Sequence, residues 1–165
     1  MTSNSKNQFR FRSWTLGAYS YKEAAGELNV PGSMQTARSA GAQRRLSSGT
    51  GEHAGHLIGR QFGGPGDIRN LGLQNPNINT FAPRELHQAF RGSGGSYRKL
   101  ESHWGDLLKQ GYRVRVTVRD MYNRNENRPF ARQVRWTEIS PGGAAEQKQL
   151  NFGNFGSPQR QAANL

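Results

Sequence analysis

Two polar stretches of the chain carry the residue types that phosphodiester chemistry needs. His53 and His56 lie just before a glycine-rich turn, and a segment that starts at Asn70 and ends at Asn79 follows closely. A neutral imidazole can take a proton from water, and an amide oxygen can hold a Mg²⁺ ion that keeps most of its waters. Each residue also has a simpler explanation, since His56 could be a core histidine and Asn79 a helix N-cap.

The inventory of acids and cysteines excludes several other chemistries. The chain has no Cys, which rules out disulfides, thiolate nucleophiles and Cys-ligated zinc. Its eleven acidic residues form no cluster, which argues against a carboxylate-built two-metal site and favours one Asn oxygen backed by one carboxylate. His53 and His56 would point to opposite faces of a strand, so they are poor joint zinc ligands.

The charge balance favours a polyanionic partner. The chain has 165 residues, a net charge of +12 and a pI near 11.1. Nucleic acid, an anionic membrane and an acidic protein all fit this balance. We find no transmembrane run and no signal peptide, so we expect no membrane insertion and either a cytoplasmic protein or a separately delivered domain.

Hydrophobic patterning predicts short strands, two late helices and a hairpin. We expect one domain over residues 1–140 and a Gly/Gln/Asn-rich tail over 141–165 that adds an edge strand at 150–152. Expected strands cover 9–12 (extended by Trp14 and Leu16 after a shift in phase), 19–21, 28–30, 53–58, 112–119 and 130–136. Expected helices cover 83–90 and 96–109, with one helical turn at 43–46 inside a long loop.

Side chains outside the two polar stretches have mainly structural interpretations. The aromatic residues at positions 9, 11, 14, 104 and 136 are expected in the core. The arginines at 113, 115 and 119 alternate with apolar residues, which predicts the solvated face of a strand or, alternatively, a track for phosphates. His87 and His103 are expected on the surface.

The order of these motifs resembles the DNA/RNA non-specific endonucleases of the ββα-metal (His-Me finger) class. Gly55-His56-Leu57-Ile58-Gly59, then Asn70-Leu71-Gly72-Leu73-Gln74, then Asn79 follow that family's pattern, and Tyr97-Arg98-Lys99-Leu100-Glu101 resembles its Glu-bearing helix. The similarity covers roughly residues 19–139. It implies an α+β fold: an antiparallel sheet with a ββα-metal core and two helices after the active-site loop.

The resemblance also implies a role for each candidate residue. His56 is expected to be the general base, Asn79 the sole protein ligand of Mg²⁺ (with Mn²⁺ as a substitute), and Glu101 to orient a metal-bound water. Asn70 either organises the site or is a turn residue. Where the family has Asp and Arg before the glycine, this chain has His53 and Ala54. Arg60 or Arg84 would then have to contact the substrate phosphate.

These expectations add up to a metal-dependent, sequence-non-specific endonuclease acting on DNA or RNA. The resemblance extends to toxin or effector domains of bacterial delivery systems, for which an acidic immunity or inhibitor protein is expected and action in the cytoplasm of a target cell follows. Two alternatives stay open. One is a non-catalytic nucleic-acid-binding module on the same scaffold, and the other is an RNA-restricted toxin nuclease.

Overall fold

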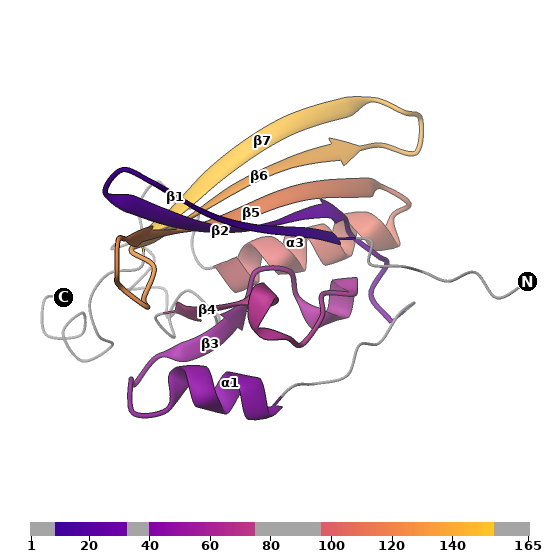
Figure 1. The fold of residues 1–165 in the computed structure, drawn as a ribbon. Coiled ribbons are helices and arrows are strands. Elements are labelled where there is room, and N and C mark those ends of the chain that lie inside the picture. Colours follow the sequence, from indigo (N-terminus) through magenta and orange to yellow (C-terminus); the bar gives the residue numbers. More distant parts are fainter. Residues whose placement is uncertain (1–8, 33–39, 75–96, 154–165) are drawn as a thin grey trace, which may run out of the picture.

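A five-stranded antiparallel sheet forms one layer of the protein (Figure 1). The computed structural model describes residues 9–32, 40–74 and 97–153. The strand order in the large sheet is β1-β2-β5-β6-β7, and β3 and β4 form a separate two-stranded sheet. The elements are β1 (Phe9–Leu16), β2 (Tyr19–Glu27), α1 (Ala40–Ser47), β3 (His53–His56), η1 (Arg60–Phe62), η2 (Ile68–Asn70), β4 (Leu71–Gln74), α3 (Tyr97–Lys109), β5 (Arg113–Asn123), β6 (Ala131–Ile139) and β7 (Ala145–Gly153). The expected α+β class is confirmed.

The core lies between the large sheet and a second layer made by α3 and the small sheet. Figure 1 shows α3 and the β3–β4 pair on the same side of the large sheet. Inward-facing valines of β5 and β6 pack against the apolar stripe of α3, where Trp104 contacts Trp136 edge to face. Leu57, Ile58 and Phe62, which follow β3, belong to the same core. Burial of this loop ties the segment after His56 to the main body of the protein.

The first two strands are longer and more regular than the sequence predicted. β1 runs without a shift in phase, so Phe9 faces the core while Trp14 faces the opposite side and stacks on Tyr21 at 5.0 Å. The prediction of Trp14 as a core residue is therefore wrong. β2 continues through Gly26, which pairs with Phe9 on one side and Val116 on the other. These ladder positions override the strand-breaking tendency of glycine.

The last strand extends well beyond the expected residues 150–152. Ala145–Gly153 pairs with β6 along nine positions, and Phe152 is 1% exposed in the core. Residues 145–153 of the expected tail thus belong to the sheet. The expected helical turn at 43–46 lies inside α1, a full helix, whereas the expected helix at 83–90 falls outside the described residues. Within the described ranges, no helix has the length and apolar content needed to cross a bilayer.

Candidate active site

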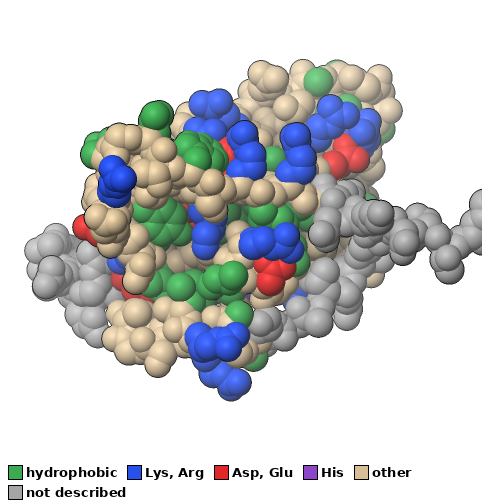
Figure 2. Space-filling model, viewed as in Figure 1, with side chains coloured by type: hydrophobic (Ala, Val, Ile, Leu, Met, Phe, Trp, Pro, Cys, Tyr) green, Lys and Arg blue, Asp and Glu red, His purple; other side chains and the backbone are tan. Residues whose placement is uncertain are grey.

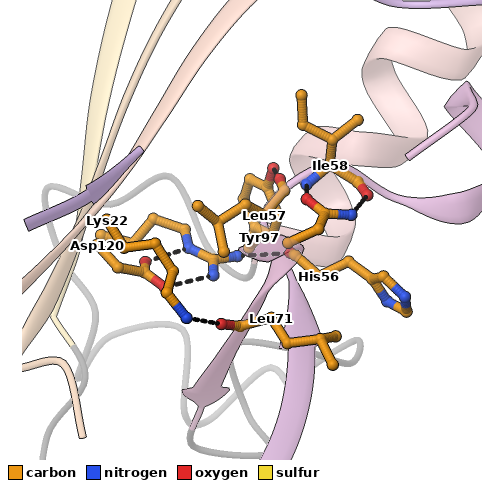
Figure 3. Close-up of polar contacts among 9 residues, drawn as sticks. Lys22, His56, Leu57, Ile58, Leu71, Tyr97 and Asp120 are labelled. Carbon is orange, nitrogen blue, oxygen red and sulfur yellow. Dashed lines mark hydrogen bonds and ion pairs between the residues drawn. The ribbon is translucent and has the colours of Figure 1, made fainter. Parts of the chain in front are cut away.

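A strand–strand–helix unit carries the candidate base. β3 and β4 pair antiparallel, with His56 opposite Leu71. α1 packs against both strands, and α3 shares a core with Leu57 and Ile58, which follow β3. His56 is the last residue of β3 and is half-buried. Figure 3 shows its imidazole directed away from the buried charged side chains beside it. The strand expected over 53–58 ends at His56, so the hairpin presents His56 at its end.

The main chain at His56 and Leu57 is held by two other elements. Arg132 on β6 donates from Nη1 to the carbonyl oxygen of His56 at 2.9 Å. The hydroxyl of Tyr97 on α3 donates to the carbonyl oxygen of Leu57. Both side chains are buried, and the Arg132 guanidinium also lies 4.7 Å from the centre of the Tyr97 ring. The backbone that carries the imidazole is thus fixed from the sheet and from the helix.

Asn70 fixes the next residue of the same segment. Its Oδ1 accepts from the N–H of Ile58 at 2.9 Å, and its Nδ2 donates to the carbonyl of Ile58 at 2.8 Å and to that of Pro65 at 2.9 Å. The side chain is fully buried. Both of its polar atoms face backbone, which is the arrangement of a residue that organises the loop between β3 and β4.

A buried charge cluster underlies the hairpin and was not anticipated from the sequence. Arg132 makes a bidentate ion pair with Asp120, at 2.6 Å and 2.9 Å, and the two residues are direct cross-strand partners. Lys22 from β2 donates to the carbonyl oxygen of Leu71 at 2.7 Å (Figure 3). The cluster therefore connects three strands of the large sheet to both strands of the small one.

Burial shapes the protonation of this cluster. The pKa of Lys22 is lowered, chiefly by burial and further by Arg132, although Asp120 opposes the change. Burial also disfavours the charged form of Arg132, but Asp120 outweighs that effect and raises its pKa. The ion pair with Asp120 is what allows a charged guanidinium to sit beside the His56 carbonyl.

Glu101 is buried beside the loop that follows His56. It is 8% exposed, so its carboxylate is not a solvated group at the edge of the helix. A Cβ built on Gly59 would lie 2.9 Å from its Oε1, so the absence of a side chain at Gly59 makes room for the carboxylate. Burial raises the pKa of Glu101 to about 7, while Arg98, 3.5 Å away, and Arg132 favour the charged form. A buried carboxylate with a raised pKa is suited to proton exchange or to a nearby cation.

The remaining predicted site residues are not brought together by the described part of the chain. Asn79 and Arg84 fall outside the described residues, and Arg60 is exposed at the start of η1. His53 is exposed on β3. The described residues include no group of three His, Cys, Asp or Glu that could hold a metal ion, and Glu101 is the buried carboxylate beside the loop that follows His56.

The comparisons with known proteins identify the family. A family model described as DNA/RNA non-specific endonuclease matches residues 23–138, so the chain belongs to that family and is a nuclease. Two Staphylococcus aureus proteins, from strains USA300 and NCTC 8325 / PS 47, are each named Type VII secretion system protein EssD. Each is 34% identical over 100 residues, which is 60% of this chain and 14% of the relative.

A solved structure confirms the fold but adds no function of its own. The structure, named extracellular nuclease, is 15% identical and has a TM-score of 0.52 over 90% of this chain and 85% of the other. The resemblance read from the sequence is thereby confirmed for family and fold class. The chain spans about one seventh of the length of the curated relatives, so the activity of those whole proteins does not transfer directly.

Proposed function

We propose that the protein is a metal-dependent, sequence-non-specific endonuclease that hydrolyses phosphodiester bonds in DNA, with RNA as a second substrate. Family membership supports the reaction class. The observation that carries the proposal is the fixation of the backbone at His56 and its two successors by Arg132, Tyr97 and Asn70. Such rigid support is expected for a residue that must hold a proton-accepting atom in place, and it has no evident purpose for an exposed loop histidine.

In this proposal His56 accepts a proton from water as the water oxygen attacks phosphorus and the 3′ oxygen departs. Asn79 would hold a divalent cation, Mg²⁺ or Mn²⁺, with Glu101 orienting water around it, and the bound cation would neutralise developing charge on the phosphate. Asn70 acts through the loop and does not contact substrate. Arg60 and Arg84 would contact phosphate in place of the arginine that Ala54 replaces.

A cleavage assay with matched histidine variants tests this mechanism. Purified wild type, His56→Ala and His53→Ala are incubated with plasmid DNA and with RNA, in Mg²⁺ or in EDTA. We expect cleavage by wild type and His53→Ala in Mg²⁺ only, and a loss of at least 100-fold in His56→Ala, which is typical when a general base is removed. Equal cleavage by wild type and His56→Ala would refute the role of His56.

The same assay separates the two other candidate functions. Because Ala54 stands where the family has an arginine, one alternative is a protein that binds nucleic acid without cutting it. Such a protein would show binding but no metal-dependent cleavage. Cleavage of RNA alone would identify an RNA-restricted nuclease. Comparison of the two substrates therefore identifies an RNA-restricted nuclease, and a binding measurement with the same substrates identifies a non-catalytic module.

We also propose that this domain acts as an antibacterial effector delivered by a secretion system. The support is its similarity to proteins named for type VII secretion and its net charge of +12, which suits capture by an acidic immunity protein. Expression of wild type should arrest growth of a host that lacks the partner, while His56→Ala should not. Equal toxicity of the two proteins would contradict the effector proposal.

A further inference from the structure

The face of the large sheet that points away from α3 is rich in arginine. The sheet register puts these side chains out of phase with the buried positions of each strand, and Figure 2 shows Lys and Arg side chains gathered over the strands. We call this surface the outer face. The charged residues that the register assigns to it are six arginines and two glutamates, namely Arg10, Arg12, Arg113, Arg115, Arg119, Arg135, Glu23 and Glu27.

Part of this charge is held in a rigid cluster. Glu23 accepts from Arg12 at 2.6 Å and from Arg119 at 2.7 Å, and it is buried beneath them. Both guanidinium groups also lie over the ring of Trp14, at 5.2 Å and 5.0 Å, and Trp14 stacks on Tyr21. One carboxylate thus orders two arginines and leaves the cluster with a net positive charge, so little side-chain entropy remains to be lost when an anion binds.

A hollow of about 570 Å³ crosses β5, β6 and β7 on the same face. Cross-strand geometry puts Arg115 and Arg135 in diagonal positions roughly 7–8 Å apart, because Arg115 pairs with Thr137. Arg115 forms an ion pair with Glu27 at 3.5 Å, whereas Arg135 makes no ion pair with any residue that the structure describes. The outward side chains lining the hollow are arginines, hydroxyls and amides: Arg115, Arg135, Thr117, Thr137, Gln147 and Gln149.

We propose that the outer face is a second nucleic-acid-binding surface that contacts the phosphate backbone, opposite the face that carries His56. Arginine forks, hydroxyls and side-chain amides are the groups that bind phosphate oxygens without reading sequence. The excess of four positive charges, together with a lining free of large apolar side chains pointing outward, favours a polyanion over an apolar protein partner. This inference rests on the proposed function. It adds to that function a contact that long substrates reach and short substrates do not.

The test measures binding separately from cleavage. Arg115→Gln/Arg135→Gln is placed in a His56→Ala background and compared with Lys109→Gln/Arg124→Gln, which removes the same charge from exposed positions outside the hollow. Affinity for a duplex of several hundred base pairs is measured against salt. We expect the outer-face variant to lower the log–log salt slope by about 1.8, and to weaken binding roughly 10- to 60-fold near 0.1 M salt. The control should change both by much less.

A cleavage experiment with the active protein completes the test. The Arg115→Gln/Arg135→Gln variant should cut plasmid more slowly than wild type, and should cut a duplex of about ten base pairs at the wild-type rate. Equal binding losses in the outer-face and control variants would show only a net-charge effect and would overturn the proposal. Unchanged binding would also overturn the proposal, and an acidic protein would then be the better candidate partner for the outer face. If wild type fails to cleave any substrate, the proposed activity fails while the binding measurement still decides this surface.

Discussion

Replacement of Arg132 by Met should damage the site through the buried cluster. The change removes both bonds to Asp120, which is 0% exposed, and the bond to the carbonyl oxygen of His56. It keeps an unbranched side chain of similar length against the Tyr97 ring. Two effects follow: Asp120 keeps a buried carboxylate that has lost its bidentate partner, and His56 loses its support from the sheet.

The first effect sets the expected loss of stability. Removing one partner of a buried ion pair costs about 3–5 kcal/mol, against a typical total of roughly 5–15 kcal/mol for a domain. For a chain of this size the melting temperature should fall by about 10 °C or more. The second effect concerns catalysis, since a displacement of about 1 Å at the reacting group can reduce the rate about 100-fold.

A double variant separates these two effects. In Arg132→Met/Asp120→Val no charge is left unpaired at the two positions, so most of the lost stability should return. The bond to the His56 carbonyl stays absent, so kcat on plasmid DNA should stay about 10- to 100-fold below wild type at a temperature where all proteins are folded. Recovery of both melting temperature and kcat in the double variant would refute the positioning role of Arg132.

Three further predictions concern the same region. Asn70→Ala should lower the free energy of unfolding by about 3 kcal/mol or more in chemical denaturation, because the buried N–H and carbonyl of Ile58 lose their partner; an effect below 1 kcal/mol would contradict this. The pKa of Glu101 is raised in the folded protein, so its protonated form stabilises the fold. This contribution to folding stability is fully present below about pH 4.5 and is lost as the pH rises through about 7. Glu101→Gln should therefore have a free energy of unfolding above that of wild type at pH 8, by about 3 kcal/mol at most, and equal to it at pH 4.5. A less stable variant at pH 8 would refute the argument that burial raises this pKa. Gly72→Ala should lower the melting temperature, because the new Cβ would lie 2.2 Å from Oδ2 of Asp120 and must displace it; an unchanged melting temperature would show that the cluster yields.

Regular alternation and helix periodicity made the central elements predictable, whereas the edges of the sheet were not. The alternating valines of β5 and the stripe on α3 were read correctly because each element buries one face. Gly26 and the polar sequence of β7 are typical of residues outside strands. They belong to the sheet only because they pair with neighbouring strands. Trp14 was placed in the core by residue type, although the unbroken phase of β1 assigns it to the outer face.

The candidate site was predictable only at positions that resemble the family motifs. His56, Asn70 and Glu101 were proposed in that way, and the structure describes how each is held. Arg132 and Asp120 were missed, although a signal was present: each is a charged residue in the inward phase of its strand, next to apolar inward positions, and their charges are opposite. Their contact with His56 depends on strand register, which the sequence alone did not determine.

The small size of the β3–β4 pair ties the site to the cooperativity of the whole domain. Two strands of four residues are too short to persist alone in water, so the hairpin depends on α1, which packs against both strands, and on Arg132, Tyr97 and Lys22, which reach it from the surrounding layers. Opening the hairpin alone would strip bonds from buried charges, which makes such local opening nearly as costly as unfolding. An incompletely folded chain therefore has no ordered hairpin, and we expect the proposed activity of His56 to appear only once the surrounding layers have formed.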